Sequence, residues 1–374
     1  MSTTVPDIRI PEAIRPQDGR FGCGPSKVRP EAVEALAAAG AGPLGTSHRQ
    51  RPVRDLVGRA RAGVAELMQL PDGYEVMLGN GGATLFWDAA TFNLIEARSQ
   101  HLSFGEFSSK FAAAAAAAPH IGEAEVIESE PGDHPEPRPD PGVDAYCLTH
   151  NETSTGVAME VRRPAADGLV LVDGTSAVGG LRLDPTQFDA YYFSPQKCLG
   201  SEGGTWLAAC SPRALERIER LRAERWTPAS LDLALALDNA RKDQTYNTPS
   251  VGTLILLVDQ LDWIAANGGI EWAAGRADAS AAIIYGWAEA SEYATPFVAD
   301  PAKRSHTVAT IDLDERVPAT TVSQVLRANG IVDTESYRKL GRNQLRVALF
   351  PTIDPEDVRA LTACVDHVVA ALTA

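Results

Sequence analysis

The sequence predicts an α/β fold in which helices cover a mainly parallel sheet, followed by a smaller C-terminal α+β domain. Apolar, strand-like stretches alternate with helical patterns as far as about Cys210, as is typical of a parallel sheet with helices on both faces. The character of the sequence changes after Gly268-Gly269. A chain of 374 residues is also longer than one hydrophobic core usually supports. We therefore expect an extended N-terminal segment (1–20), a large domain (21–267) and a small domain (268–374).

The elements of the large domain follow from periodicity and from turn residues. Pro30 opens the first helix, where its missing N–H costs little. Apolar runs bounded by glycine predict buried strands, and a run of alanines favours helix because alanine has the highest helix propensity. The expected helices cover 30–39, 53–70, 83–95, 112–118, 212–223 and 251–265. The expected strands cover 74–78, 101–104, 145–148, 168–172, 188–193 and 203–210.

The small domain shows the same kinds of pattern over shorter lengths. A long helix over 270–290 connects it to the large domain. Two apolar stretches predict strands over 306–311 and 344–350, and helical periodicity predicts helices over 320–329 and 355–371.

Composition restricts the partners of the protein. The chain has 49 acidic and 34 basic residues, a formal net charge of −15, which argues against nucleic acid and against an anionic membrane as partners. An anionic substrate must then be bound by local arginines.

Five scattered cysteines without CxxC spacing argue against a disulfide framework or a metal site, and favour a reducing compartment. Residues 1–17 do not resemble a signal peptide and no apolar run reaches transmembrane length, so we expect a cytoplasmic protein.

Lys197 and Asp173 are the most informative residues. Lys197 follows the predicted strand over 188–193, where burial would lower its pKa toward that of a reactive amine. Asp173 directly follows the predicted strand over 168–172. Together they are typical of a site for pyridoxal phosphate, where the lysine forms a Schiff base and the aspartate keeps the pyridine nitrogen protonated. The alternative is a lysine in a solvated loop and an aspartate that caps a helix.

Three further features belong to the same predicted edge of the sheet, because open α/β sheets bind ligands outside the carboxyl ends of their strands. The turn Gly82-Ala83-Thr84 would offer helix N-terminal amides to an anion, although it lacks the P-loop lysine and full dinucleotide spacing. Thr153 would donate to a ring hydroxyl or a phosphate, and Phe107 would stack on a pyridine ring. The alternatives are a structural turn, turn chemistry for Thr153 and core packing for Phe107.

Six blocks, in this order, resemble the phosphoserine aminotransferases, a class V group of the fold-type I pyridoxal phosphate enzymes. The blocks are FGCGPS (21–26), TSHR (46–49), NET (151–153), DGTS (173–176), SPQK (194–197) and NTPS (247–250). The resemblance runs from about Phe21 to the C-terminus and, through the stretch 337–346, is closest to an actinobacterial-like branch. It implies a seven-stranded, mainly parallel sheet in the large domain and a homodimer with shared active sites.

The resemblance also implies a role for each site residue. Lys197 would form the Schiff base and move the proton between Cα and C4′, Asp173 would pair with the pyridine nitrogen, Thr153 would touch the ring oxygen and Phe107 would stack on the ring. The cofactor phosphate would be bound by Gly82, Ala83, Thr84 and Gln196, and by Asn247 and Thr248 from a second subunit.

Arginines would bind the substrate in this family. His48 and Arg49 of the partner would bind its phosphate, and Arg346 its α-carboxylate, because a planar fork matches a carboxylate bidentately. The better-known branch has a His-Arg pair shortly before that last arginine, where this chain has Tyr337-Arg338-Lys339 and Arg342. The resemblance leaves open which of Arg338, Lys339 and Arg342 completes the phosphate pocket.

The implied reaction converts L-glutamate and 3-phosphohydroxypyruvate into 2-oxoglutarate and O-phospho-L-serine, a step of serine biosynthesis. Whether 4-phosphohydroxythreonine, of pyridoxine biosynthesis, is also a substrate stays open. The nearest alternative is another class V enzyme, such as an alanine– or serine–glyoxylate aminotransferase. A cysteine desulfurase is disfavoured because no cysteine lies between the small-domain strands. A Rossmann-type nucleotide-binding module would use the glycine-rich turn for a dinucleotide instead.

Overall fold

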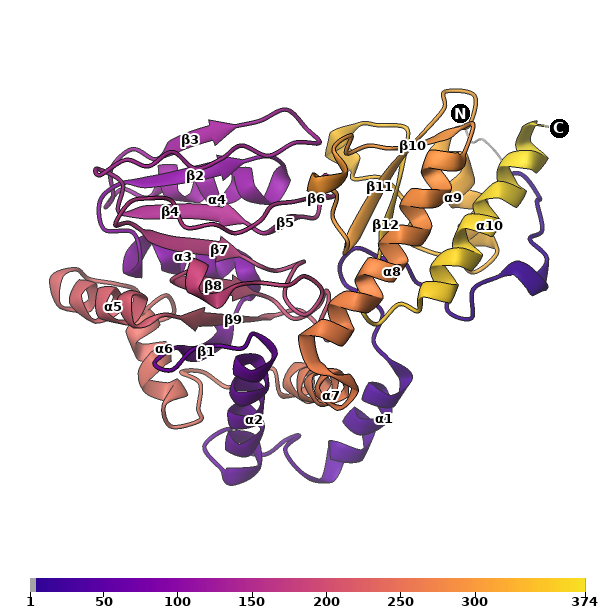
Figure 1. Cartoon of the computed structure of the whole chain (residues 1–374). Helices are drawn as coiled ribbons and strands as arrows, with labels where there is room; N and C mark the ends of the chain where they lie inside the picture. Colours follow the sequence, from indigo (N-terminus) through magenta and orange to yellow (C-terminus); the bar gives the residue numbers. More distant parts are fainter. Residues whose placement is uncertain (1–4, 374) are drawn as a thin grey trace.

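A seven-stranded sheet forms the centre of the larger part of the molecule in the computed structural model, which describes residues 5–373 (Figure 1). The strand order is β1-β9-β8-β7-β4-β2-β3, and β9 alone runs antiparallel to its neighbours. The predicted mainly parallel sheet of seven strands is therefore confirmed. Its strands are β1 (Glu75–Asn80), β2 (Ser99–Ser103), β3 (Glu125–Glu128), β4 (Ala145–Thr149), β7 (Leu169–Asp173), β8 (Ala190–Phe193) and β9 (Thr205–Cys210).

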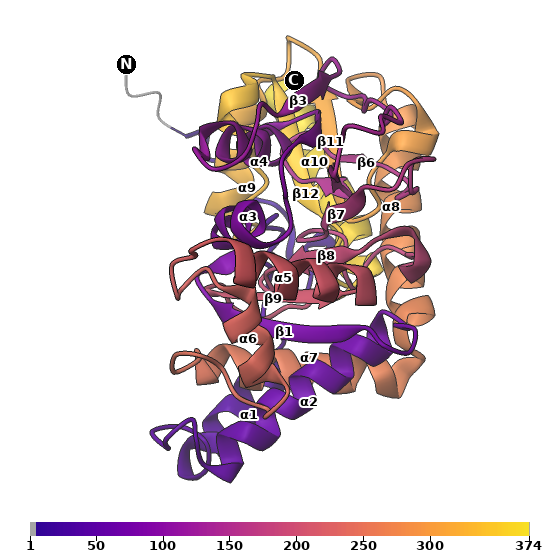
Figure 2. The same cartoon turned by 90° about the vertical axis from the view of Figure 1, so that its left-hand side faces the viewer.

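Helices cover both faces of this sheet. Successive strand residues point to opposite faces, so Val170 and Val172 join one core with α2 and α7, whereas Leu169 and Leu171 join another with α3 to α6. Figure 2 shows α1, α2 and α7 together beside β1. The helices are α1 (Pro30–Ala38), α2 (Arg51–Leu67), α3 (Gly82–Asn93), α4 (Glu106–Ala117), α5 (Pro212–Glu224), α6 (Leu233–Ala240) and α7 (Val251–Asn267).

The C-terminal part is a smaller α+β unit beside the large sheet (Figure 1). Its antiparallel sheet has the order β10-β11-β12. The long helix α8 leads into it, with Gly268 as its N-cap and Gly269 as its first residue, both with positive φ (119° and 69°). Its elements are α8 (Gly269–Ala290), β10 (Ala294–Pro296), β11 (Val308–Leu313), α9 (Ala319–Ala328), β12 (Gln344–Ala348) and α10 (Pro355–Thr373). A two-stranded ribbon, β5 (Asn151–Glu152) and β6 (Val157–Ala158), follows β4.

The N-terminal segment packs with the C-terminal unit. Ile10 and Phe21 are buried in the core that β11, β12 and α10 share, and the backbone N–H of Phe21 donates to Val332 O at 3.2 Å. The division at residues 20 and 267 stays a prediction. Within residues 5–373, no helix is long and apolar enough to cross a membrane.

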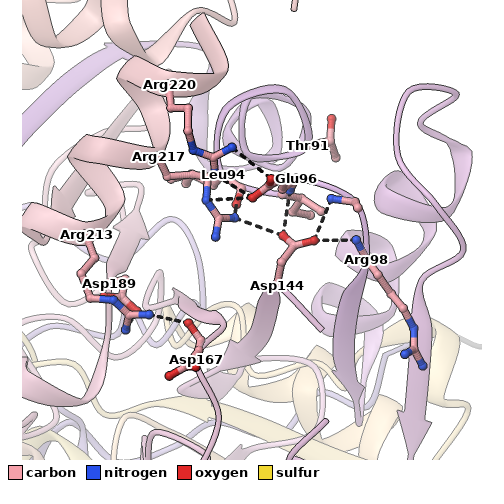
Figure 3. A network of polar contacts seen from close by, with 12 residues as sticks. Thr91, Leu94, Glu96, Arg98, Asp144, Asp167, Asp189, Arg213, Arg217 and Arg220 are labelled. Atoms are coloured by element: carbon pink, nitrogen blue, oxygen red, sulfur yellow. Dashed lines mark hydrogen bonds and ion pairs between the residues drawn. The ribbon is translucent and has the colours of Figure 1, made fainter. Parts of the chain in front are cut away.

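A polar network fixes the amino-terminal edge of the large sheet (Figure 3). The Asp144 carboxylate, at the start of β4, accepts the backbone N–H groups of Glu96, Ala97 and Arg98 at 2.7, 2.7 and 2.6 Å. It also accepts from Arg217 Nη1 of α5 at 3.1 Å. This one side chain therefore ties the turn before β2, the start of β4 and the helix α5 together.

Candidate active site

A cavity of about 400 Å³ opens at the opposite, carboxyl edge of the large sheet, where the C-terminal unit meets it. Nine residues that the sequence predicts for cofactor or substrate line it: Gly82, Ala83, Thr84, Phe107, Thr153, Asp173, Gln196, Lys197 and Arg346. They come from strand ends, helix starts and loops that are far apart in the chain. The structure thus brings together the predicted residues of one subunit that would hold pyridoxal phosphate.

Lys197 lies on the cavity wall just after β8. Its Nζ donates to Thr153 Oγ1 at 2.7 Å and lies 4.9 Å from the centroid of the Phe107 ring. Burial lowers the pKa of Lys197, and the negative charge of Asp173 opposes this shift. A Cβ on Gly24 (φ 137°) would lie 2.9 Å from Lys197 Cε, so glycine is needed there for the backbone to pass this close. The amine is therefore buried at the cavity wall, with a lowered pKa and a single hydroxyl as its hydrogen-bond partner among the described residues.

Asp173 is the last residue of β7 and is buried. Its Oδ1 accepts the backbone N–H of Thr175 at 2.9 Å. Burial raises the pKa of Asp173, while the hydrogen bond from the Thr175 backbone N–H and the charge of Lys197 work against this rise. A buried carboxylate that lacks an arginine or lysine in direct contact is suited to accept a cationic partner such as a protonated ring nitrogen.

The start of α3 faces the cavity with its backbone amides. Gly81 precedes the helix with φ 116°, and no side chain caps the helix end. Gly82, Ala83 and Thr84 of the first turn line the cavity, and Gln196 lines it too. Uncapped amides and the helix dipole together favour an anion at this end of the cavity.

A hydrogen-bonded chain runs along another wall. Thr153 Oγ1 donates to Ser176 Oγ at 2.9 Å, and Ser176 Oγ donates to Asn151 O at 3.0 Å. Several buried polar atoms around the cavity have no protein partner within residues 5–373: Asn151 Oδ1, Thr175 Oγ1, Gln196 Oε1 and Arg346 Nε. Because buried polar groups are nearly always paired, these atoms are available to a polar ligand in the cavity.

Arg346 reaches the cavity from β12 of the C-terminal sheet. Its Nη1 donates to Thr153 O at 3.2 Å, and its guanidinium carbon lies 5.3 Å from the centroid of the Tyr337 ring. An arginine inside an apolar strand lowers the stability of the fold unless its charge is paired or hydrogen-bonded. Here it presents a cation to the cavity, as a carboxylate-binding residue would.

The other basic residues of this stretch do not line the cavity. Arg342 pairs with Asp312 of β11 and lies over the Phe297 ring, Lys339 Nζ lies 2.5 Å from Glu106 Oε1, and Arg338 is exposed. The neighbouring Tyr337 lines the cavity instead. A phosphate contact by Arg338, Lys339 or Arg342 stays a prediction.

His48, Arg49, Asn247 and Thr248 lie together, but outside the cavity; we call them the exposed cluster. His48 Nδ1 and Thr248 Oγ1 are 3.1 Å apart, and Arg49 donates to Thr245 O and Tyr246 O at 3.2 and 3.3 Å. Asn247 and Thr248 are exposed. All four were assigned to a neighbouring subunit's site, and within one chain none of them lines this cavity.

Among the cavity residues that were not singled out from the sequence are six with polar or aromatic side chains or a thiol: Cys23, Trp87, Asn151, Thr175, Ser176 and Tyr337. Five of them stand inside the recognised blocks or the 337–346 stretch, so a closer look at each block would have found them. Trp87 is different, since it lies on α3 one turn beyond the glycine-rich start and carries no local signal.

Comparison with known proteins assigns the chain a family. The aminotransferase class-V family model matches residues 23–334. A protein of Mycobacterium avium (strain 104), provisionally named a phosphoserine aminotransferase, is 60% identical over 98% of either chain. The phosphoserine aminotransferase of Rhodococcus opacus (strain B4) is 56% identical over 97% of this chain and 98% of its own. The crystal structure of a phosphoserine aminotransferase from Cytophaga hutchinsonii superimposes with a TM-score of 0.87, at 26% identity, and covers 94% of this chain and 99% of that one.

Proposed function

The chain belongs to the class V aminotransferases, within their phosphoserine aminotransferases, and we propose that it transfers the amino group of L-glutamate to 3-phosphohydroxypyruvate. The products are 2-oxoglutarate and O-phospho-L-serine. The observation that carries this proposal is the cavity itself, in which Lys197, Asp173 and Arg346 converge. A reactive amine, a buried carboxylate and a carboxylate-binding cation are what transamination of an amino acid requires.

The residues fit pyridoxal phosphate. When bound, this cofactor supplies a carbonyl that takes up the amino group and a ring that withdraws electrons. Lys197 would hold it covalently, Asp173 would pair with its ring nitrogen and Phe107 would cover one face of the ring. The uncapped start of α3, with Gln196, would take its phosphate. The unpaired polar atoms Asn151 Oδ1 and Thr175 Oγ1 lie where a polar ligand would complete them.

The chain's own groups supply positioning and proton transfer. Because burial lowers its pKa, Lys197 Nζ gives up its proton more readily than an exposed lysine, and it would then take the α-proton of the amino acid and return it. Arg346 would hold the α-carboxylate of either substrate, so that the Cα–H bond points at Nζ. Tyr337, packed against the Arg346 guanidinium, would limit the positions that this cation adopts.

The phosphate of the keto acid would be bound by His48 and Arg49 of a second subunit. Within one chain both residues are outside the cavity, and Arg49 is exposed, which supports a site where a partner presents them. We therefore propose a homodimer with shared sites, located in the cytoplasm and acting in serine biosynthesis. A second use of 4-phosphohydroxythreonine is an extension of the same phosphate recognition.

A coupled assay on the purified protein tests this proposal. Glutamate and 3-phosphohydroxypyruvate should give 2-oxoglutarate at a kcat/KM well above that for keto acids without phosphate, such as glyoxylate or hydroxypyruvate. A preference for glyoxylate would favour the alanine– or serine–glyoxylate alternative. A protein that binds a dinucleotide and no pyridoxal phosphate in an absorbance scan would overturn both.

A further inference from the structure

We infer that Glu152 is a positioning residue for the cofactor site, acting through Phe107 and Thr153 without touching the cofactor. Glu152 is fully buried, yet it does not line the cavity. Among the described residues, it takes part in no salt bridge. A buried carboxylate without a cation is expensive unless hydrogen bonds replace its hydration, so its donors show what it does.

The donors are backbone amides at the start of α4. Glu152 Oε2 accepts the backbone N–H of Phe107 at 3.1 Å and that of Ser108 at 2.9 Å, with the Ser108 hydroxyl at 3.0 Å. Its other oxygen, Oε1, accepts the Ser154 hydroxyl at 2.7 Å, and Ser154 Oγ accepts the N–H of Glu106 at 3.0 Å. The first three amides of this helix are thus satisfied by the side chains of Glu152, in β5, and Ser154, in the turn that follows it.

The helix has no cap of its own, because its N-cap residue is Gly105. A Cβ there would come within 2.3 Å of Glu152 Cγ and 2.6 Å of Ser154 Oγ. An ordinary capping residue such as serine or aspartate is therefore excluded by the two side chains that replace it. The backbone amides at the start of α4 therefore depend on a carboxylate from outside the helix for their hydrogen bonds.

This carboxylate connects two walls of the cavity. Phe107, whose N–H it binds, covers Lys197 Nζ from one side at 4.9 Å. Thr153, the next residue in the chain, accepts a hydrogen bond from the same Nζ at 2.7 Å. Glu152 therefore fixes the aromatic face and the hydroxyl relative to each other. Loss of its charge would release the ring and the hydroxyl together, and pyridoxal phosphate would bind more weakly to both.

The test compares Glu152→Gln with Asp144→Asn. Glu152 accepts a third backbone N–H, that of Ser154, on Oε1 at 3.2 Å. Asp144 is a matched control because it also accepts three backbone N–H groups, at the opposite edge of the same sheet (Figure 3). Both changes keep the side-chain shape and remove one charge, so both should lower the thermal midpoint of the apoprotein. Only Glu152→Gln should raise the Kd of the apoprotein for pyridoxal 5′-phosphate, by about 10- to 100-fold, and change the visible circular dichroism of the bound cofactor.

Equal Kd values for Glu152→Gln and wild type would overturn the inference, and so would an equal rise in Kd for Asp144→Asn. If Glu152→Gln does not fold, Ser154→Ala removes one donor and one amide acceptor and should still raise Kd several-fold. An unchanged Kd in that variant would also count against the inference. The inference rests on the proposed function, but the two fail differently: a wild-type protein that does not bind pyridoxal phosphate refutes the function, whereas tight binding unaffected by these variants refutes only the role of Glu152.

Discussion

At the scale of single residues, the site contains two buried ionisable groups that the free protein does not fully compensate. Burial shifts the pKa of Lys197 downward and that of Asp173 upward, so each group loses more by desolvation than its neighbours return. Such opposing shifts are typical of functional sites. The cost is offset only when a ligand supplies the missing partners, so stability and function should respond oppositely when one of these groups is removed.

Lys197→Ala should abolish turnover and leave no cofactor covalently attached after borohydride reduction. No other lysine among the described residues lines the cavity, so nothing else can form the bond. Peptide mapping of the reduced wild-type protein should place the adduct on Lys197. The exposed Lys242 provides the control, since Lys242→Ala should keep activity and adduct. An adduct on Lys110 or Lys242 would contradict the assignment.

Asp173→Asn should lose most activity, because an unprotonated pyridine withdraws electrons poorly, while its apoprotein gains stability. Burial raises the pKa of Asp173 in the folded state, so at pH values above its unfolded pKa the folded state binds more protons, and wild-type stability falls as pH rises through this window. Because Asn does not titrate, the free energy of unfolding of the variant lacks this dependence on pH. Its gain in the free energy of unfolding should therefore be larger at about pH 7.5 than at about pH 4.5, as urea denaturation would measure. A gain independent of pH would show that the Asp173 charge is not the cause.

At the scale of elements, the two edges of the large sheet use their polar groups differently. The carboxyl edge leaves amides and side chains unpaired for ligands, whereas at the amino edge Asp144 uses its acceptors on the turn before β2 and on α5 (Figure 3). The division is typical of open α/β sheets. Two buried or half-buried carboxylates with similar donors, those of Glu152 and Asp144, are therefore expected to have different effects on ligand binding.

Asp144→Asn should lower the free energy of unfolding by about 1.5–3 kcal/mol, because charge-assisted hydrogen bonds are lost and an amide N–H₂ would face donors. The kcat/KM should stay close to that of wild type, since no cavity residue is involved. Denaturation and steady-state kinetics on the same preparation measure both. The nearby, more exposed ion pair of Arg220 and Glu96 is a control: Arg220→Ala should cost less than about 1 kcal/mol.

Sequence reasoning predicted most of the elements that are long or continuously apolar, but it missed the eight-residue apolar helix α6. Strands such as β7 and β8 are buried on both faces and read as apolar runs, and Lys197 and Asp173 were found because they follow such runs. It did not predict β3, whose residues alternate at the sheet edge, or β10, which is three residues long and ends in proline. The cap that Glu152 forms on α4 could not be predicted either, because the two segments are 45 residues apart and the cap leaves no local sequence pattern.

At the scale of the whole molecule, the residues proposed for one active site lie in two separate places. The cavity is lined by those proposed for the cofactor and the α-carboxylate, while His48, Arg49, Asn247 and Thr248 are held together elsewhere in the exposed cluster. Arg49 is fixed by backbone carbonyls of Thr245 and Tyr246, so the cluster is a preformed surface feature. A charged surface held in place in this way is suited to complete the site of a second copy.

Arg49→Ala should raise the KM for 3-phosphohydroxypyruvate more than that for glutamate, because a dianionic phosphate depends more on this charge than a γ-carboxylate does. Loss of one charge-assisted contact should cost about 1.5–3 kcal/mol, roughly 10- to 150-fold in kcat/KM. The control is Arg51→Ala, whose exposed side chain pairs with Asp55 at 3.2 Å. Equal effects on both substrates would mean that Arg49 only holds the loop around Thr245, and would favour the glyoxylate-type alternative.

Mixing Lys197→Ala with Arg49→Ala tests whether the sites are shared between subunits. If Arg49 acts in the partner's site, a mixed dimer has one site with Lys197 from one chain and Arg49 from the other, and a second site that lacks both. Random exchange at equal amounts gives about half mixed dimers, so activity with phosphohydroxypyruvate should reach about a quarter of the wild-type value. If Arg49 acts within its own chain, no site regains both residues and mixing adds nothing. Lys197→Ala mixed with wild type gives the baseline for exchange, and a fully active monomer in sedimentation would refute sharing altogether.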